Sequence, residues 1–336
     1  MNIRVVREAG GIGDIVRIIP VLRGLREKYP AARLWVFAPA TYRPLLRGWY
    51  DEYVATPHHG RRNRDAALDE NRWPYLNVGV AFDRSISLYC PAFTYEVRQG
   101  RDVRLDRIDL FCQAAGVQPS SKLPVVNLHP ADVRAAKEYV IEHELWERGK
   151  LIAVQPYSTD PARNWPLANW LRLAAALERA GHRVVILDGA EGRTRPFRQH
   201  RVIGRPLGFV AALLSLCDLL VGPDSGLGHL AAAVNTPCVG VFASQSGEIM
   251  YRHYPLHTYV EPSRDTPASC EWPCFWKRPA RCTRAALLKA GKTCEMIGRI
   301  SVGEVFGAVN HRCSDRTMLR SRISDPAHRG GRRRGG

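Results

Sequence analysis

The sequence predicts an α/β protein made of two successive domains, each with a parallel β-sheet wrapped by helices. Short apolar stretches alternate with helix-length amphipathic stretches, and glycine-rich turns follow several of the apolar stretches. The chain has 336 residues and is 45% hydrophobic, so it can bury two cores. Ligands of open parallel sheets bind beyond the carboxyl ends of the strands, and we therefore expect a cleft between the two domains.

The first half of the chain alternates strand and helix from its first residues. An apolar strand over 2–6 precedes a glycine-rich turn, and a helix over 15–28 follows with apolar residues at helical spacing. Pro20 lies in the second turn of this helix and is expected to kink it. The other predicted elements are strands over 34–37, 52–55 and 75–82, helices over 42–46, 103–115 and 130–148, and a polar surface loop over 58–69.

The second half repeats the same rhythm. Its predicted strands cover 151–155, 183–187, 218–221 and 238–242, and its predicted helices cover 167–180 and 208–216. We expect one domain over residues 1–145 and a second over 150–312. A basic tail over 313–336 is predicted to be disordered, because it is rich in arginine and glycine and has little to bury.

The chain is strongly basic, with 49 Lys and Arg against 32 Asp and Glu and a formal charge of +17. This charge favours an anionic partner, such as a membrane surface, a lipid-linked phosphate or nucleic acid, although genome composition also explains an arginine bias. No stretch approaches the roughly 20 apolar residues of a membrane span. The first residues read as a strand instead of a signal peptide. We expect a cytoplasmic protein with peripheral contact to the anionic inner membrane.

One stretch, residues 217–242, organises the second half as strand, turn, helix and strand. A short apolar strand ends at Gly222-Pro223, and Asp224 or Ser225 is expected to cap the following helix through its side-chain oxygen. Gly226 and Gly228 allow another backbone or a ligand to come close. The free amides at such a helix start are a natural seat for phosphate. The alternative is an ordinary strand-to-helix turn.

The turn after the first strand carries Asp14 behind three glycines. This carboxylate is either a helix cap or a general base facing the cleft, and the two roles are compatible. The turn does not complete a dinucleotide-binding fingerprint, because no third glycine follows Gly11 and Gly13 at the required place. An acidic residue is also missing at the end of the second strand, so the pattern argues against NAD.

Three motifs together resemble glycosyltransferase family 9, the heptosyltransferases. They are Gly10-Gly11-Ile12-Gly13-Asp14, the segment 158–166, and Asp224-Ser225-Gly226-Leu227-Gly228-His229-Leu230-Ala231. The resemblance covers roughly residues 1–310. It implies a GT-B fold of two facing Rossmann-like domains, with the acceptor on the N-terminal side and the nucleotide sugar on the C-terminal side. It also implies an ADP-heptose donor, inversion at the anomeric centre, and no cofactor for the transfer.

The resemblance assigns roles to individual residues. Asp14 matches the proposed base. Arg163 stands where many members have lysine, and it keeps the positive charge toward the diphosphate but is unsuited to donating a proton. Glu191 matches an acidic residue near the nucleoside, and the alternative is an exposed turn glutamate. The other residues expected to bind substrate are Gly11, Gly13, Asp224, Ser225, Gly226, Leu227 and His229, the last of which alternatively packs the helix.

Four of the nine cysteines lie within 25 residues, at Cys270, Cys274, Cys282 and Cys294. In a reducing compartment this spacing favours a tetrathiolate site for structural zinc or iron, with free structural thiols as the alternative. The spacing resembles the iron-binding finger of bacterial autotransporter heptosyltransferases, which implies iron, a protein acceptor and a homo-oligomer. Because the first residues already read as a strand of the first sheet, we expect no additional N-terminal domain of the kind seen in that group, and this leaves both the acceptor and the oligomer open.

Two other functions are compatible with parts of this sequence. A nucleotide-sugar epimerase also uses two facing Rossmann-like domains, but Asp14 in the acceptor-side turn favours transfer. A basic nucleic-acid-binding protein would use the arginine tail, but that tail lacks aromatic residues for stacking bases. The predicted activity is therefore transfer of a sugar from a nucleotide donor. The acceptor is a lipopolysaccharide-type glycan, another lipid-linked group, a protein hydroxyl or a small molecule.

Overall fold

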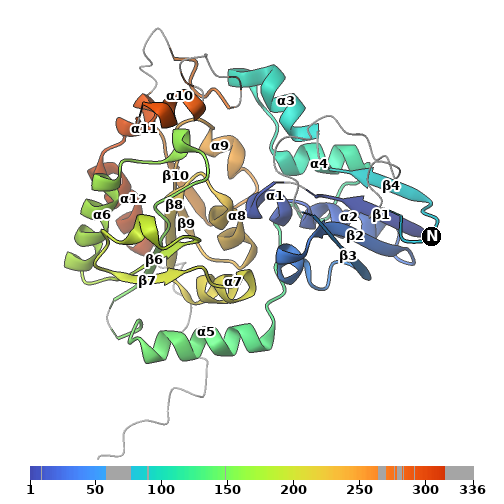
Figure 1. The fold of residues 1–336 in the computed structure, drawn as a ribbon, viewed down its shortest axis with the longest axis horizontal. Coiled ribbons are helices and arrows are strands. Elements are labelled where there is room, and N and C mark those ends of the chain that lie inside the picture. Colours follow the sequence, from blue (N-terminus) through green and yellow to red (C-terminus); the bar gives the residue numbers. More distant parts are fainter. Residues whose placement is uncertain are drawn as a thin grey trace, which may run out of the picture.

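The computed structural model describes residues 1–8, 10–57, 77–88, 91–147, 149–263, 270–275, 277, 282, 284–290 and 292–314. Two separate sheets lie side by side, one in each half of the chain (Figure 1). The first has the strand order β3-β2-β1-β4 and the second has the order β10-β9-β8-β5-β6-β7. Neighbouring strands pair in parallel throughout both sheets. The predicted α/β class is confirmed.

The first sheet contains β1 (Asn2–Val6), β2 (Arg33–Pro39), β3 (Glu52–Thr56) and β4 (Arg84–Ser87). Its helical elements are α1 (Ile12–Val16), α2 (Ile19–Lys28), η1 (Ala40–Leu46), α3 (Pro91–Gln99), η3 (Gly100–Asp102) and α4 (Arg107–Ala115). Helix α5 (Pro130–Glu142) follows and packs against α7 of the second half. The apolar residues of β1, α1 and α2 supply much of the core beneath this sheet.

The helix expected over 15–28 is two helices. Helix α1 ends at Val16, Arg17 and Ile18 follow, and α2 begins at Ile19 with Pro20 in its first turn. Proline is well tolerated there, because the first-turn amides of a helix have no partner inside that helix. Pro20 therefore starts a second helix and does not kink one long helix.

The strand expected over 75–82 is wrong within the described residues, because 77–82 form no strand and β4 begins only at Arg84. Val78 and Phe82 use their apolar side chains to pack against Val6 and Phe37 on the first sheet. Residues 58–69, expected to form a surface loop, lie outside the described residues. The apolar pattern of this segment therefore predicted correctly that some of its side chains pack on the sheet, but predicted a strand that does not form.

Two further helix boundaries differ from the prediction. Helix α4 starts at Arg107, four residues later than expected, because the carboxylate of Asp106 accepts the amide of Ile108 at 2.7 Å and caps the helix there. Helix α5 ends at Glu142 and not at residue 148. Glu144 adopts a φ of 52°, outside the right-handed helical region, so the helix cannot continue, and Leu145 is buried in the first core beyond the helix end.

The second sheet contains β5 (Leu151–Val154), β6 (Arg183–Asp188), β7 (His200–Ile203), β8 (Leu219–Pro223), β9 (Cys238–Val241) and β10 (His257–Val260). Its longer helices are α6 (Leu167–Arg179), α7 (Leu207–Leu216), α8 (Gly226–Ala233) and α12 (Val302–Ser314). The short ones are η4 (Pro161–Arg163), η5 (Gly192–Thr194), α9 (Gly247–Met250), α10 (Arg284–Lys289) and α11 (Glu295–Gly298). The sequence pattern did not predict β7 and β10, the strands at the two edges of this sheet.

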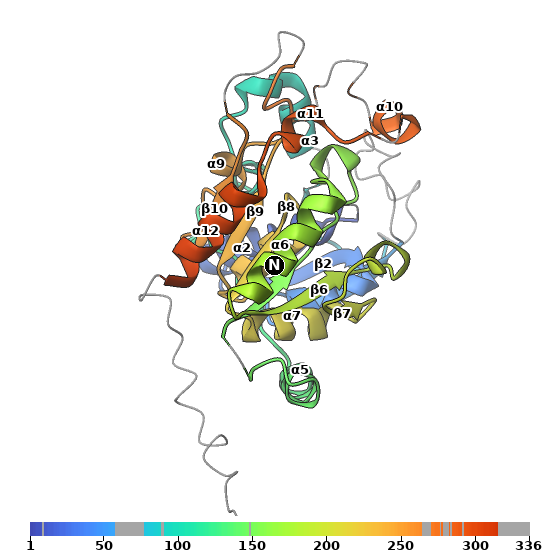
Figure 2. The ribbon, with the colours of Figure 1, turned by 90° about the vertical axis from the view of Figure 1, so that its left-hand side faces the viewer.

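Helices cover both faces of the second sheet. Helices α6 and α12 lie together on the face turned away from the first sheet, whereas α8 lies on the face between the sheets (Figures 1 and 2). Helix α12 ends at Ser314, and the rest of the predicted tail, from residue 315, lies outside the described residues. Among the described helices none is long and apolar enough to cross a membrane.

The two halves meet where α1 packs on α8. A Cβ built on Gly226 would lie 2.7 Å from Cβ of Ile12 and 2.9 Å from the nitrogen of Gly13. Real Cβ atoms do not come this close to backbone, so only glycine allows this approach. The contact brings the turn after β1 directly against the start of α8, and the predicted glycine-rich turns of the two halves therefore face each other.

Candidate active site

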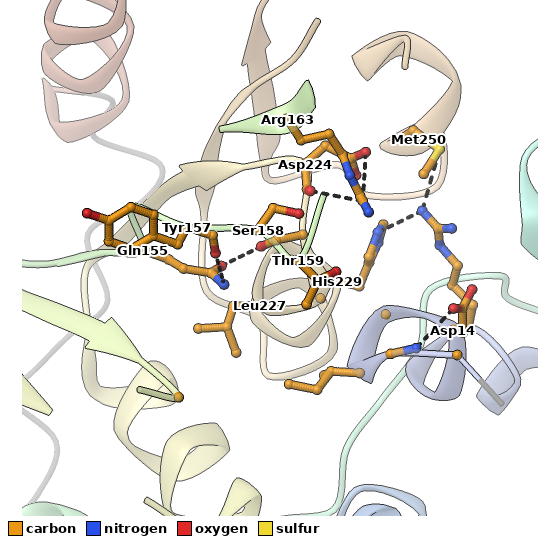
Figure 3. Close-up of a pocket in the computed structure, with 18 of the residues that line it drawn as sticks. Asp14, Gln155, Tyr157, Ser158, Thr159, Arg163, Asp224, Leu227, His229 and Met250 are labelled. Atoms are coloured by element: carbon orange, nitrogen blue, oxygen red, sulfur yellow. Dashed lines mark hydrogen bonds and ion pairs between the residues drawn. The ribbon is translucent and has the colours of Figure 1, made fainter. Parts of the chain in front are cut away.

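A cleft of about 420 Å³ lies between the two halves. The turn after β1 and helix α1 form one side of it, and the carboxyl ends of β5, β6, β8 and β9 form the other. Its size is that of a small-molecule site, and its position is the one expected for a pair of parallel sheets. Figure 3 shows Asp14 on one side and Arg163 with Asp224 on the other, with His229 between them in this view.

The cleft collects nearly all the residues expected to bind substrate. Those that line it are Gly11, Gly13, Asp14, Arg163, Asp224, Ser225, Gly226, Leu227 and His229. Glu191 does not line it; this residue is exposed and precedes η5. Tyr157, Asp188 and Arg193 line the same end instead, and the Arg193 guanidinium binds the Asp188 carboxylate at 2.7 and 2.9 Å. The lining residues include five arginines and three aspartates.

The start of α8 keeps its amides clear of side-chain caps. Ser225 is the N-cap residue, as the sequence allowed, but its side chain makes no capping hydrogen bond. The Ser225 hydroxyl instead donates to Oε1 of Gln155 at the end of β5. The predicted capping bond is therefore wrong, because the Ser225 hydroxyl is used by Gln155, which lies 70 residues away in the sequence. The uncapped amides can hold an anion, as helix starts commonly do.

Arg163 is held beside this helix start. Its guanidinium donates to the backbone oxygen of Asp224 at 3.1 Å and to the Asp224 carboxylate at 3.2 Å. The Asp224 side chain is 2% exposed and the Arg163 side chain 12%, so this pair lies in the wall of the cleft and not in bulk solvent. The arrangement places a permanent positive charge next to the α8 amides.

Asp14 lies at the centre of a buried ion-pair network. One carboxylate oxygen is 2.5 Å from the guanidinium of Arg107 and 3.4 Å from that of Arg7, and the other accepts the backbone amide of Gly11 at 3.1 Å. Arg107 in turn binds Glu96 of α3 through two bonds of 2.7 Å. Three elements, α1, α3 and α4, thus fix the carboxylate that the sequence singled out.

This network determines the charge of Asp14. Burial by itself would raise the pKa of the Asp14 carboxyl, but the charges of Arg107, Arg7 and Arg17 outweigh burial and hold that pKa well below its usual range. The group is therefore ionised at every pH at which an enzyme works. It is available to accept a hydrogen bond or a proton from a bound hydroxyl.

His229 ties the two halves together. Its Nε2 lies 2.7 Å from the guanidinium of Arg17, the residue after α1, and its Nδ1 lies 3.0 Å from the hydroxyl of Tyr254. Burial, followed by the charge of Arg17, lowers the pKa of His229 well below its ordinary value. The imidazole is neutral, accepts from Arg17 through Nε2 and donates to Tyr254 through Nδ1.

Sequence reasoning missed six charged residues at this site, namely Arg7, Arg17, Glu96, Arg107, Asp188 and Arg193. Arg107 lies 93 residues from Asp14, and no local spacing links the two. A usable signal existed for Arg7, which directly follows β1, and for Arg17, a charge on the buried side of an apolar helix. A charge in such a position is rarely left without a partner.

The cysteine segment does not assemble a metal site within the described residues. No three His, Cys, Asp or Glu side chains there are grouped closely enough to hold an ion. The Cys274 sulfur points toward the backbone oxygen of Ser244 at 3.7 Å, whereas Cys270 and Cys294 pack against the second apolar core. The four-thiolate cluster expected from the spacing is therefore not formed in this structure.

A sequence model described as Glycosyltransferase family 9 (heptosyltransferase) matches residues 84–256, which is more than half of the chain. The chain belongs to glycosyltransferase family 9. The protein is accordingly a heptosyltransferase-like enzyme, as the three motifs had indicated. The matched segment includes Arg107 and Arg163. It also includes the turn after β8 and helix α8, which open on the cleft.

Two curated relatives are named lipopolysaccharide heptosyltransferase 2. Those from Salmonella typhimurium and Escherichia coli are each 26% identical, over 283 and 282 residues respectively, covering 70% of this chain and 81% of the relative. Among solved structures, a glycosyltransferase family 9 protein from Veillonella parvula superposes with a TM-score of 0.68 at 18% identity, covering 93% of this chain and 97% of that one. The E. coli ADP-heptose lipopolysaccharide heptosyltransferase II superposes with a TM-score of 0.64 at 18% identity, covering 93% and 98%. These neighbours confirm the GT-B fold.

A third solved structure is TibC from enterotoxigenic E. coli, described as an iron-containing dodecameric glycosyltransferase. It superposes with a TM-score of 0.63 at 16% identity and covers 93% of this chain but 75% of that one. At this identity the likeness shows the shared fold alone. The iron and the dodecamer are properties of TibC.

Proposed function

We propose that this family 9 enzyme transfers a heptose from ADP-heptose to a hydroxyl group of an acceptor, with inversion at the anomeric carbon. The single observation that carries the proposal is that Asp14 and the start of α8 open on one cleft, from opposite sides. The Asp14 carboxylate faces the uncapped α8 amides, which can bind an anion, across the cleft. This arrangement suits a displacement in which a hydroxyl attacks and a diphosphate leaves.

On this proposal, the acceptor oxygen forms a bond to the anomeric carbon while the bond from that carbon to the diphosphate oxygen breaks. The bonding electrons leave with ADP, and the hydroxyl proton passes to the Asp14 carboxylate. Although the pKa of Asp14 is low, a hydroxyl that is bonding to an anomeric carbon becomes strongly acidic, and a weak base suffices. The α8 amides and Arg163 stabilise the charge on the leaving group, and Asp224 accepts from sugar hydroxyls.

Residues 1–145 are the proposed acceptor-side domain and residues 150–312 the nucleotide-sugar domain. The names of the curated relatives favour a lipopolysaccharide-type acceptor, and a protein hydroxyl is the second candidate. We place the enzyme in the cytoplasm, at the inner membrane surface, on the strength of its basic charge. No cofactor takes part in the proposed transfer.

The first experiment is thermal unfolding with ADP, UDP, GDP and dTDP at equal concentration, on wild type and Arg163→Ala. A nucleotide at about 100 times its Kd stabilises a protein by about 2.7 kcal/mol, an easily measured shift. We expect a selective shift with ADP that Arg163→Ala reduces. A larger shift with another nucleotide would change the donor, and no shift with any of them would reject the proposed reaction.

We propose separately that the four cysteines hold a structural iron or zinc ion, on the basis of their spacing. Such a site requires Cys274 to turn away from the Ser244 carbonyl. Elemental analysis of the purified protein is expected to find about one iron or zinc per chain, and Cys282→Ser to lose it. A folded, active and metal-free protein would assign these residues to packing as free thiols.

A further inference from the structure

We propose that Gln245 binds a hydroxyl of the donor sugar and sets which sugar the enzyme accepts; this inference rests on the proposed function. Gln245 lines the cleft and is 1% exposed. Within the described part of the chain, neither its amide nitrogen nor its amide oxygen has a hydrogen-bond partner. A buried amide with both polar atoms unsatisfied destabilises a fold, so its presence in a binding cleft indicates that a ligand completes it.

The backbone on both sides of Gln245 is fixed. The amide of Phe242, just after β9, donates to the backbone oxygen of Val260 at 2.9 Å, and the backbone oxygen of Ser244 accepts the amide of Phe275 at 2.7 Å. Helix α9 begins two residues after Gln245. The side chain therefore lines the cleft from a well-held segment, as is required of a residue that selects a ligand.

The order of the strands indicates which part of the donor Gln245 meets. Strands β9, β8, β5 and β6 are consecutive neighbours in the sheet. Tyr157, Asp188 and Arg193 follow β5 and β6 at one end, and the α8 amides follow β8 in the middle. Gln245 follows β9 at the other end. A nucleotide sugar with its diphosphate on α8 and its nucleoside toward β6 directs its sugar toward Gln245.

The chemistry of the amide agrees with this position. A diphosphate offers acceptor atoms only, so it can satisfy the amide nitrogen of Gln245 but not the amide oxygen. A sugar hydroxyl both donates and accepts, and two neighbouring hydroxyls satisfy both atoms. A site built to hydrogen-bond a hydroxyl also rejects analogues that lack it, because its buried polar group is then left unpaired.

The test compares Gln245→Leu with Gln155→Leu in the full chain. Gln155 is the matched control, since it lines the same cleft but its amide is already satisfied by Ser225 and by the backbone oxygen of Tyr157. Calorimetry measures the Kd of ADP and of ADP-heptose for wild type and Gln245→Leu. We expect the Kd of ADP to stay within about twofold and that of ADP-heptose to rise about tenfold or more.

Thermal unfolding without ligand gives a second, independent readout. Gln245→Leu is expected to keep or raise the Tm, because it removes an unpaired buried amide, whereas Gln155→Leu is expected to lower it. An equal loss of ADP and ADP-heptose affinity, no loss of either, or a Tm that falls as far as in Gln155→Leu would overturn the inference. Wild type that binds neither nucleotide would overturn the proposed donor, and the Tm comparison would still decide whether the amide is unpaired.

Discussion

Replacing Arg107 by glutamine tests whether the buried network controls Asp14. The Arg107 guanidinium is 2.5 Å from the Asp14 carboxylate and is held in place by Glu96. Arg107→Gln removes the charge and keeps a polar side chain of smaller size. The result expected is a pKa of Asp14 that moves up into the range where enzyme activity is measured.

The size of this shift follows from the geometry. With the two charge centres roughly 4 Å apart and an effective dielectric constant of about 20, the ion pair contributes about 4 kcal/mol. One pKa unit corresponds to about 1.36 kcal/mol, so losing Arg107 should raise the pKa of Asp14 by about 3 units. Arg7, Arg17 and the amide of Gly11 still favour the charged form, whereas burial opposes it.

The assay is the pH profile of kcat/KM, which reports the pKa of the essential base in the free enzyme. Wild type should show no acid limb down to the pH at which it unfolds, and Arg107→Gln should lose activity below a measurable apparent pKa. Arg107→Lys retains the charge and should shift the limb less. Arg107→Gln also removes the ion pair that Arg107 makes with the buried Glu96, so each profile is recorded where circular dichroism shows a folded protein. An unchanged acid limb in Arg107→Gln, or full activity in Asp14→Asn, would refute the reasoning.

Two further predictions concern the junction of the halves and the response to pH. Gly13→Ala should lower kcat by about 100-fold or more, because its Cβ would meet the His229 ring at 2.5 Å and displace α1; activity within threefold of wild type would contradict this contact. Burial lowers the pKa of His257 to about 4, so the folded state takes up its proton later than the unfolded state as pH falls. Stability should therefore drop by about 2 kcal/mol between pH 7.5 and 5 on account of this group. Urea unfolding at both pH values should show a smaller drop in His257→Gln, in which glutamine can still donate to the Gly228 oxygen; equal drops would count against the assignment.

Much of the fold could be predicted because its strands are apolar and its turns are rich in glycine. The central strands β1, β5 and β8 are buried on both faces. Their residues are almost all apolar, so the local sequence alone predicts buried strands. Strand β4 was missed because its residues, Arg84–Ser87, are mostly polar, and the strand exists through its pairing with β1. Edge and partner-dependent strands carry no such signal of their own.

The candidate site likewise combines residues that a local motif reveals with residues that only tertiary packing brings in. Asp14 and the turn around Asp224 were found because each motif is local and its glycines are unusual. The partners of Asp14 could not be found, since Glu96 and Arg107 come from α3 and α4 and reach it only through tertiary packing. Gln245 carries no motif at all, and only its burial without a partner reveals it. Sequence thus located Asp14 and the α8 turn at the cleft but not the residues that surround the Asp14 carboxylate.

The surplus of arginine over aspartate in the cleft has a consequence for turnover. In the proposed reaction, the nucleoside diphosphate left behind after sugar transfer has one more ionisable phosphate oxygen than the diester that entered. A cleft lined by five arginines and three aspartates holds the more anionic molecule more tightly. On the proposed reaction, transfer therefore leaves a product that the cleft holds more tightly than the donor, and we expect release of this nucleotide to be the slow step of the cycle. Moderate salt should quicken that step by screening the field, up to the point at which capture of the donor suffers.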